Sequence, residues 1–469
     1  MISSEQNDRM TRVGPDQPAG RLLRRYWQPA ALVDEFSSAQ AGQRPVKAVR
    51  LLGQDLVLFR DEAGRWGLLD RDCPHRGADL AYGRREHGGL RCPFHGWLFD
   101  VNGRCLETPA EPDSSRMCER IQQRSYPVVE KAGVVWAYLG EGEPPAFPAL
   151  DCFVAPESHV FAFKGLWDCN WLQALEVGID PAHASFLHRF FEDEQTGEAA
   201  YGRQFRNASS DSDIPMTRVL REFYRPEILV EPAAHGLHLT AFRRIDERNT
   251  HVRLTNQVFP QAFAIPMSDE MTITQWHVPV DDTHSYWYAF FTSFSTPVDK
   301  ALMREQRLKL HELPDYRPRV GRRNGWGFDV GEQLTQTYTG MGMDINVHDQ
   351  WACESQGGIQ DRTREHLGSS DKAVIAYRRM LLRAIDTVEQ GGTPPMCLSS
   401  DEAARVRGPV TMDGVGPTAD HEQMRDYGLG IDRRRRARAP WGAAFDVGAP
   451  GAAGVSNPAV AAAVAPNGA

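Results

Sequence analysis

The stretches Cys73-Pro-His75-Arg-Gly and Cys92-Pro-Phe-His95-Gly-Trp decide the fold of the first third of this chain. Each stretch carries one cysteine and one histidine, and sixteen residues separate His75 from Cys92. The proline and glycine residues in both stretches are typical of loops, so we expect the four side chains at loop tips rather than inside strands. Thiolate and imidazole groups in this arrangement indicate a metal site.

Two kinds of metal site take two thiolates and two imidazoles. One is a structural Zn²⁺ site, and the other is a Rieske-type [2Fe–2S] cluster, in which two cysteines hold one iron and two histidines hold the other. Zinc motifs usually pair cysteine with cysteine and histidine with histidine, whereas each half is mixed here. A mixed half lets each loop supply one ligand to each iron, so we interpret Cys73, His75, Cys92 and His95 as ligands of a [2Fe–2S] cluster.

A second set of candidate ligands lies further along the chain, in Asp180-Pro-Ala-His183-Ala-Ser-Phe-Leu-His188. Asp180 and His183 share one face of a helix, but His183 and His188 are about 140° apart on an ideal helix. The two histidines converge on one metal only if the helix is distorted or ends between them, and Gly178 and Pro181 favour such a distortion. Because a [2Fe–2S] cluster only moves single electrons, we expect a second iron that activates O₂ at these histidines.

Such an iron is typically Fe(II) on two histidines and one carboxylate, with positions left open for oxygen and substrate. The carboxylate must come from elsewhere in the chain. We choose Asp349, because its neighbours predict the start of a helix. Spacing alone does not separate Asp349 from Asp344, Glu354 and Asp361.

Composition excludes several classes of protein. The 469 residues are 41% hydrophobic and 25% charged, and no apolar run approaches the roughly 20 residues of a membrane span. The polar N-terminus has no apolar signal core, so we expect a cytoplasmic protein. The formal charge of −9 disfavours a nucleic-acid binder, which needs a basic face. Eight cysteines are too few for a disulfide scaffold, and we expect buried free thiols at the six outside the motif, Cys105, Cys118, Cys152, Cys169, Cys353 and Cys397.

The chain divides into three parts by pattern, and its fold class is α+β. Short strand-like runs with frequent turns cover residues 46–139, and three prolines between Gly142 and Pro148 mark a boundary. We predict an N-terminal segment and all-β cluster-binding domain over residues 1–150, and a catalytic domain over residues 151–430. The catalytic domain is expected to combine an antiparallel sheet with helices on one side. Its predicted strands are 219–224, 237–242, 252–259 and 286–291, and its predicted helices are 170–191, 298–313 and 369–390.

Residues 431–469 are predicted to be a disordered tail, because Ala, Gly, Val and Pro dominate after Pro440. Four arginines, Arg433 to Arg436, precede this stretch. They could bind an anionic partner, but we favour a solvated run of charge.

Taken together, the two motifs resemble those of Rieske non-haem iron aromatic-ring oxygenases, specifically the oxygenase (α) component. The resemblance covers roughly residues 15–400. Within this family the chain is most similar to the phthalate-oxygenase branch, on the strength of three segments. They begin at Arg24 (Arg-Arg-Tyr-Trp), at Asn170 (Asn-Trp-Leu-Gln-Ala-Leu-Glu-Val-Gly-Ile-Asp-Pro-Ala-His) and at Asp361 (Asp-Arg-Thr-Arg-Glu-His-Leu-Gly-Ser-Ser-Asp).

The resemblance implies a role for each candidate ligand. Cys73 and Cys92 would hold one iron of the cluster, and His75 and His95 the other. The catalytic domain would be a helix-grip sheet over a substrate pocket. The mononuclear iron would be held by the remaining three, His183, His188 and Asp349.

The resemblance also implies an assembly and partners. Asp180 would act in catalysis by bridging His95 of one subunit to His183 of its neighbour, within a homotrimer or stacked trimers. A separate NAD(P)H-dependent reductase would supply electrons, and an aromatic substrate would be hydroxylated, dihydroxylated or O-demethylated with O₂. Ring dioxygenases often carry Asn where Glu176 stands, so the role of Glu176 is open.

One arginine suggests a carboxylated substrate. In the predicted strand that starts at Leu237, residues 237, 239, 241, 243 and 245 share a face, and this places Arg243 among apolar side chains. A buried charge needs a partner, so we hypothesise that Arg243 binds a substrate carboxylate. A structural salt bridge with an internal acid is the commoner reason for such an arginine.

Two other functions from different classes fit parts of the sequence. The first is a zinc-stabilised binding module, which would be colourless. The second is an electron carrier without catalysis, which would hold no second iron. The histidine pair His183 and His188 disfavours both.

Overall fold

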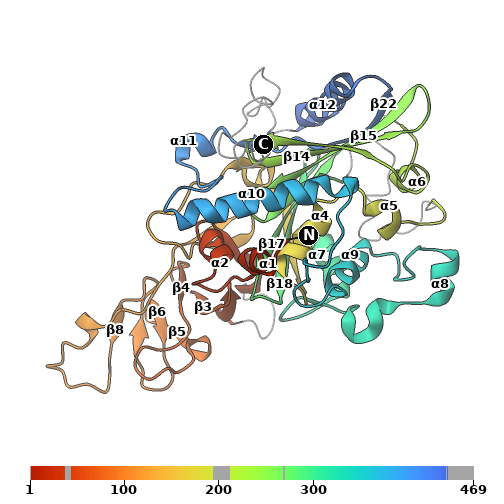
Figure 1. Cartoon of the computed structure of the whole chain (residues 1–469). Coiled ribbons are helices and arrows are strands. Elements are labelled where there is room, and N and C mark those ends of the chain that lie inside the picture. The colour runs from red at the N-terminus through yellow and green to blue at the C-terminus, as the bar shows by residue number, and fades with distance from the viewer. Residues whose placement is uncertain (1, 37–43, 194–211, 268–269, 440, 442–469) are drawn as a thin grey trace.

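The computed structural model describes residues 2–36, 44–193, 212–267, 270–439 and 441. A small all-β region projects from one end of a larger body that is built on an antiparallel sheet (Figure 1). The prediction of an α+β chain with an all-β N-terminal part and an antiparallel C-terminal sheet is therefore confirmed. Within the described ranges, no helix combines the length and the apolar character that crossing a membrane requires.

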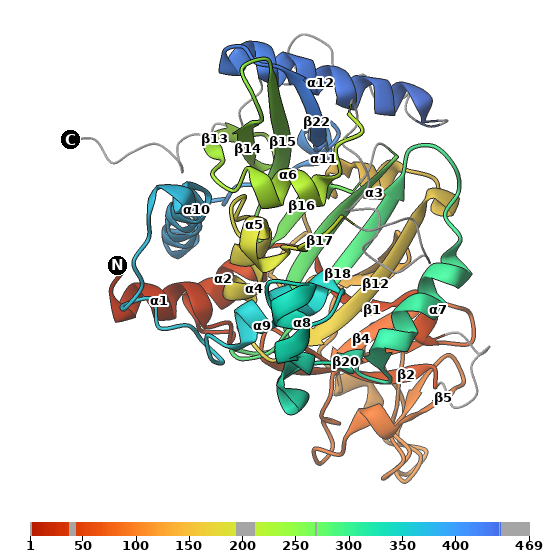
Figure 2. The same cartoon turned by 90° about the vertical axis from the view of Figure 1, so that its right-hand side faces the viewer.

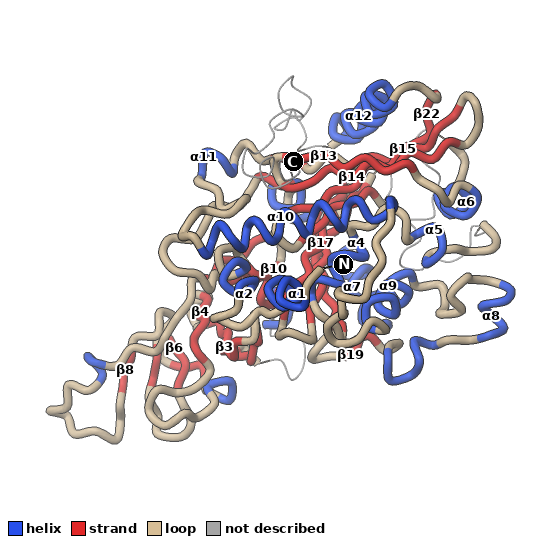
Figure 3. The backbone as a smooth tube through the Cα atoms, in the orientation of Figure 1, coloured by secondary structure: helices blue, strands red, loops and turns tan. Residues whose placement is uncertain are grey.

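The projecting region consists of two small sheets joined by long loops (Figure 3). Its apolar core surrounds Cys73 and Cys92 with side chains such as Phe59, Leu90 and Phe99. One sheet contains β2 (Val46–Leu51), β3 (Gln54–Arg60) and β4 (Trp66–Asp70); the other contains β5 (Arg84–Glu86), β6 (Gly89–Arg91), β7 (Leu98–Phe99) and β8 (Cys105–Glu107).

The body contains an eight-stranded sheet in the order β12-β18-β17-β16-β15-β14-β13, in which every pair is antiparallel. The eighth strand, β22, pairs with β15 along the edge that β16 leaves free. The strands are β12 (Val160–Trp167), β13 (Glu227–Ala233), β14 (Gly236–Arg244), β15 (Asn249–Val258), β16 (Ala262–Pro266), β17 (Met271–Pro279), β18 (Ser285–Ser293) and β22 (Met412–Pro417).

Register sorts the side chains of this sheet onto two faces. Ala241 pairs with Arg253, and Phe263 pairs with Gln275, so these four side chains share one face. The other face carries Trp276 and Phe290, whose rings contact Trp136. Trp136 belongs to a third sheet of β1 (Gln28–Leu32), β10 (Val134–Ala137) and β9 (Val128–Lys131), which therefore covers the face away from Arg253.

Helices pack on the first face and at the edges of the sheet (Figure 2), and α3 and α12 also contact the other face, through Phe153 and Met424. Helix α4 contacts β16 and β17, and α10 contacts β13 and α2. The helices are α1 (Ser4–Thr11), α2 (Pro18–Leu23), α3 (Asp151–Val154), α4 (Trp171–Gly178), α5 (Ala184–Leu187), α6 (Met216–Glu222), α7 (Lys300–Leu310), α8 (Val330–Thr335), α9 (Ile345–Glu354), α10 (Lys372–Glu389), α11 (Ser400–Ala403) and α12 (His421–Arg438).

The first helix packs against the body rather than against the projecting region. Arg9 of α1 lies 2.6 Å from both Asp386 and Glu389 of α10, although more than 370 residues separate them in sequence. The described part of the N-terminal segment thus shares a core with the catalytic sheet. The division of the chain at residue 150 stays a prediction.

The prediction of a disordered tail is wrong for residues 431–438. These residues form the last part of α12, which lies across β22 and β15 (Figure 2). Arg435 and Arg436 are buried, and Asp432 on the same helix pairs with both. The four arginines are therefore not a solvated run, because helical spacing turns two of them inward to an acid. Residues 442–469 lie outside the described part of the chain.

Most of the other predicted elements agree with the structure, with two exceptions. Residues 219–224 were predicted to be a strand, but Pro215 begins a helix whose inward face is apolar, and α6 continues to Glu222. The helix predicted over 170–191 is interrupted and forms α4 and α5. The six cysteines outside the motif, all within the described residues, are free thiols as predicted; four of them are buried, whereas Cys118 and Cys397 are half-buried.

Candidate functional site

The two cysteine–histidine stretches fold into loops of the same shape. In the first loop Gly77 N–H donates to Cys73 O at 2.8 Å, and in the second Gly96 N–H donates to Cys92 O at 3.0 Å. Both glycines have φ near +75° (+73° and +77°), a backbone conformation that glycine adopts at little cost. These turns bring the cysteine and histidine of each stretch to the same loop tip, as the sequence predicts.

The four side chains form an inner pair and an outer pair. Cys73 and Cys92 are buried in the apolar core, whereas His75 and His95 are partly exposed, with ring centroids 4.5 Å apart. The Nδ1 atom of His95 is buried and has no hydrogen-bond partner. Two inner thiols and two outer imidazoles fit a two-iron cluster with one iron on each pair.

The second centre begins where helix α4 ends. Gly178 is the last residue of α4, and α5 does not start until Ala184. His183 precedes α5 and His188 follows it, so the two rings face each other at 5.1 Å with an interplanar angle of 84°. The helix is therefore interrupted between Gly178 and Ala184, as the convergence of the two histidines requires.

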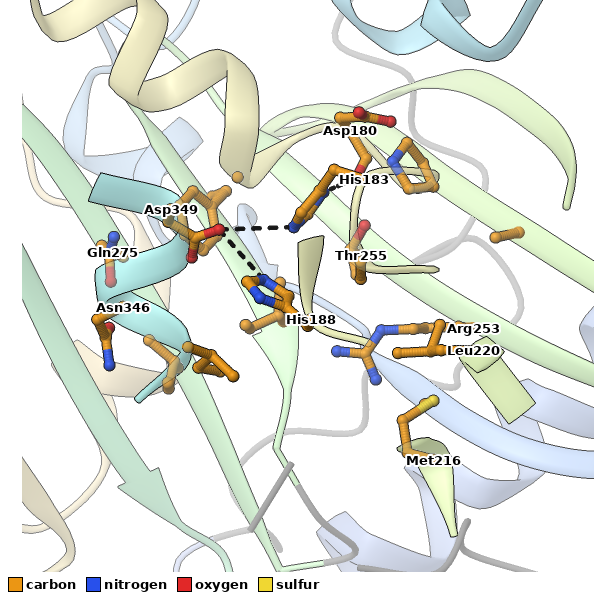
Figure 4. Close-up of a pocket in the computed structure, with 18 of the residues that line it drawn as sticks. Asp180, His183, His188, Met216, Leu220, Arg253, Thr255, Gln275, Asn346 and Asp349 are labelled. Atoms are coloured by element: carbon orange, nitrogen blue, oxygen red, sulfur yellow. Dashed lines mark hydrogen bonds and ion pairs between the residues drawn. The ribbon is translucent and has the colours of Figure 1, made fainter. Parts of the chain in front are cut away.

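Asp349, in the second turn of α9, completes this group (Figure 4). Its Oδ1 atom lies 3.1 Å from His188 Nε2 and 3.9 Å from His183 Nε2. One ligand atom from each of the three residues can be chosen so that all lie within 4.8 Å of one another.

The alternative carboxylates have other partners. Asp344 caps the start of α9, and Glu354 accepts hydrogen bonds from Asp168 N–H and Trp326 Nε1. Asp361 accepts hydrogen bonds from Thr363 in an exposed turn. Of the four acids that the sequence left open, the structure brings Asp349 to the histidines.

The hydrogen bonds around this centre leave atoms that suit a cation. A carbonyl oxygen can only accept, so His183 Nδ1–H donates to Asp180 O at 2.5 Å and its Nε2 carries a lone pair. Asp349 Oδ1 is buried and has no hydrogen-bond partner. Burial acts to raise the pKa of Asp349, but His188 and His183 outweigh it, so the pKa lies below its usual value and the carboxylate is ionised. Two histidines and one such carboxylate are the donor set that non-haem Fe(II) takes.

Asp180 contacts His183 through its main chain rather than through its carboxylate. The side-chain Oδ1 of Asp180 accepts a hydrogen bond from Ala182 N–H at 2.7 Å instead. Asp180 lines the same cavity as His183.

This centre opens into a cavity of about 150 Å³ between the sheet and helices α4, α5, α6 and α9. A cavity of this size accommodates one benzene ring. Apolar residues form just over half of its lining, and the polar ones include the three candidate ligands and Arg243. The wall includes Trp167, Ala184, Phe190, Met216, Leu220, Ala241, Phe263, Ile265, Ile273, Thr255, Gln275 and Asn346.

Arg243 lies in this wall, on the face that strand alternation predicts. Its side chain is buried, with 1% of its surface exposed, and burial lowers its pKa to about 10. Nη2 donates to Pro181 O at 2.8 Å, whereas Nε and Nη1 have no hydrogen-bond partner. No described acid forms a salt bridge with Arg243, so the commoner explanation of a buried arginine does not apply.

Several residues of the site were not predicted from the sequence. Arg253 also lines the cavity, but Asp413 of β22 pairs with it at 3.0 Å. Alternation in the run Val252-Arg-Leu-Thr could have revealed Arg253 and Thr255, since both follow the period of a half-buried strand. His348, which precedes Asp349, is fully buried against His188, and burial lowers its pKa to about 4. In the sequence, the signal for His348 is its position next to the predicted ligand Asp349.

Glu176 is part of a buried ion network behind the centre. Its carboxylate binds Arg362 at 2.8 Å and Arg378 at 2.6 Å, and Arg378 also pairs with Glu365. Burial acts to raise the pKa of Glu176, but the two arginines lower it below its usual value. The network fixes the end of α4, from which the loop to His183 starts.

Comparisons with known proteins agree with both halves of the chain. Residues 26–127 match the Rieske [2Fe–2S] domain, and residues 137–408 match the family described as LigXa C-terminal domain like. The oxygenase subunit of phthalate 4,5-dioxygenase from Pseudomonas putida is 34% identical, over 83% of this chain and 88% of that protein. The oxygenase subunit of 5,5'-dehydrodivanillate O-demethylase from a Sphingobium strain is 30% identical, over 84% and 83%.

A solved structure shows the same fold. NdmA from Pseudomonas putida CBB5, a QL mutant with theobromine, superposes with a TM-score of 0.55 at 18% identity, over 82% of this chain and 97% of that one. The matches support neither the zinc-stabilised module nor the electron carrier, since both relatives are named as oxygenase subunits. The chain is an oxidoreductase and belongs to the Rieske oxygenases, in the branch of oxygenase components that includes phthalate 4,5-dioxygenase.

Proposed function

We propose that this chain oxidises an aromatic carboxylate with O₂ at a mononuclear Fe(II) held by His183, His188 and Asp349. The observation that carries the proposal is the convergence of three ligand atoms within 4.8 Å at the wall of a ring-sized cavity. Fe(II) bound there would supply the activation of O₂, with electrons from the [2Fe–2S] cluster. The protein supplies the position of the substrate, the timing of electrons and a dry pocket.

The cluster would be held by the two loops of the projecting region. Cys73 and Cys92 would bind the inner iron, and His75 and His95 would bind the outer one. Burial of the thiols and partial exposure of the imidazoles support this arrangement. The outer iron would then be the one nearer to an electron partner.

The cavity favours a single aromatic ring that bears a carboxylate. Its mostly apolar wall shields the ring from water, and the Nε–H and Nη1–H groups of Arg243, which have no hydrogen-bond partner, can donate charge-assisted hydrogen bonds to a carboxylate. Arg253 is already paired with Asp413, whereas Arg243 in the same wall has no salt bridge among the described residues. Phthalate in the name of one relative is an aromatic carboxylate and supports the same class of substrate.

Electrons would reach the mononuclear site from a neighbouring subunit. In Figure 1, strands β5, β6 and β8 of the cluster region lie at the lower left and α5 lies at the right, with the body of the molecule between them, which favours a path from another subunit. We therefore propose a homotrimer or stacked trimers, in which Asp180 connects His95 of one subunit to His183 of the next. A separate NAD(P)H-dependent reductase would load the cluster.

The test is anaerobic purification, metal and sulfide counting, and a product screen. We expect three irons and two sulfides per chain, and a hydroxylated, cis-dihydroxylated or O-demethylated product from an aromatic carboxylate with a surrogate reductase. Light scattering should give a multiple of three chains. Two irons per chain after anaerobic reconstitution with Fe(II) would contradict the mononuclear site.

A further inference from the structure

A buried histidine that belongs to none of the ligand sets stands directly behind His188. His348 lies in α9, one residue before Asp349, and its side chain has no exposed surface. Its Nδ1 atom is 3.4 Å from His188 Nδ1. It does not line the cavity, so it has no direct contact with a substrate there.

The two rings meet edge to edge. Their planes differ by 25°, and the centroids are 5.6 Å apart while the two Nδ1 atoms are 3.4 Å apart. The distance between the centroids exceeds the distance between the Nδ1 atoms by about twice the distance from an imidazole centroid to its nitrogen. This is expected when both nitrogens lie on the line between the centroids. The Nδ1 atoms therefore face each other nearly in the plane of both rings, which is the orientation of a long N–H···N hydrogen bond.

The contact on the opposite side of the His348 ring determines which of its two nitrogens carries the proton. Nε2 of His348 is 2.9 Å from Gly342 O, and a carbonyl can only accept, so the proton of His348 is on Nε2. Gly342 is held in turn, because its N–H donates to Glu332 Oε1 at 2.8 Å. A neutral imidazole with its proton on Nε2 presents a bare Nδ1 to His188.

The bare Nδ1 atom of His348 determines the tautomer of His188. Its Nδ1–H donates to His348, so its Nε2 carries the lone pair and faces Asp349 Oδ1 at 3.1 Å. His183 is arranged in the same way by Asp180 O. The chain thus provides a separate acceptor behind each of the two histidines.

We propose that His348 is a positioning residue, which sets the tautomer and the ring orientation of His188 so that Nε2 is ready to bind metal. The inference rests on the proposed metal site at His183, His188 and Asp349. Partners behind metal-ligating histidines typically contribute 10- to 100-fold to metal affinity. A purely structural role in the core would not depend on an acceptor atom at this position.

The test compares the metal affinity of three variants by equilibrium dialysis of cluster-loaded, mononuclear-metal-free protein against Fe(II) and Co(II). His348→Leu and His348→Met keep apolar volume and remove the acceptor, so we expect the Kd to rise roughly 10- to 100-fold. His348→Gln can accept with Oε1 and donate with Nε2, and we expect a Kd within a few-fold of the original. The visible absorption of bound Co(II) should change in the apolar variants and be retained in the Gln variant.

Controls separate this inference from the proposed function. His235→Leu removes a buried, hydrogen-bonded histidine outside the cavity and should leave the Kd unchanged. If the original chain binds no third metal, the proposed function fails. If it binds metal, and whichever apolar His348 variant folds binds it equally well, the inference about His348 is overturned while the metal site stands.

Discussion

Arg243 donates from Nη2 to the main-chain oxygen of Pro181 at 2.8 Å, which ties the wall of the cavity to the loop that carries His183. The same guanidinium keeps Nε and Nη1 without partners. Arg243 can therefore act on a substrate and on the loop at once, and a useful experiment must separate the two effects.

The substrate role predicts a selective loss. Arg243→Ala should raise KM for an aromatic carboxylate at least ten-fold, because charge-assisted hydrogen bonds to the carboxylate are lost, and should change KM much less for the same ring without the carboxylate. A role limited to the loop at Pro181 would alter kcat for both substrates alike. Steady-state kinetics with the two substrates distinguish these outcomes, and equal KM shifts would end the carboxylate hypothesis.

The metal site predicts a specific loss of iron. Asp349→Ala removes the carboxylate that faces both histidines, so iron should fall from three to two atoms per chain while sulfide and the visible absorption of the cluster persist. Asp361→Ala is the matched control, because Asp361 is exposed and bonds to Thr363. It should retain three irons. A third iron that stays in Asp349→Ala would show that another group supplies the carboxylate.

Local chemistry made much of this site predictable from sequence. Cysteine and histidine spacing on two Pro/Gly loops identifies the cluster region, because each loop carries its own pair of ligands within three or four residues. Strand alternation also places Arg243 correctly, since a period of two is a local property. Interruption of the helix between His183 and His188 follows from Gly178 and Pro181.

Contacts between distant segments were not predictable in the same way. Asp349 lies 161 positions after His188, and spacing could not separate it from three other acids. Asp413 and Glu176 meet their arginines only after β22 and α10 pack. In the sequence, the arginines of α12 resemble a solvated run of charge. Asp151, the acid outside the helix that pairs with Arg436, lies 285 positions away and could not be assigned to it.

The ion network of Glu176 predicts a large effect on stability. Glu176→Gln would leave Arg362 without its acid and Arg378 with Glu365 alone, and removal of one partner of a buried pair costs about 3–5 kcal/mol. We expect a marked fall in the midpoint of thermal unfolding, with the cluster spectrum intact below the transition. Glu305→Gln, which breaks an exposed pair with Lys309, is the control and should shift the midpoint little. Similar midpoints for both variants would contradict a structural role for the network.

Buried neutral histidines predict that acid destabilises the fold. Burial and the neighbouring His238 lower the pKa of His235 to about 3. Burial lowers the pKa of His277 to about 3. Burial and the neighbouring Arg307 lower the pKa of His311 to about 4. The unfolded chain titrates near 6.5, so between about pH 6.5 and 4 it binds more protons than the folded chain, and stability falls as the pH falls. Each such histidine adds a slope of up to about 1.4 kcal/mol per pH unit in this window. Urea unfolding midpoints between pH 7.5 and 5 should therefore decrease, and the decrease should be smaller in His235→Leu, which takes up one proton fewer on unfolding. A midpoint that is constant over this range, or an equal slope in the variant, would show that these histidines are not held neutral.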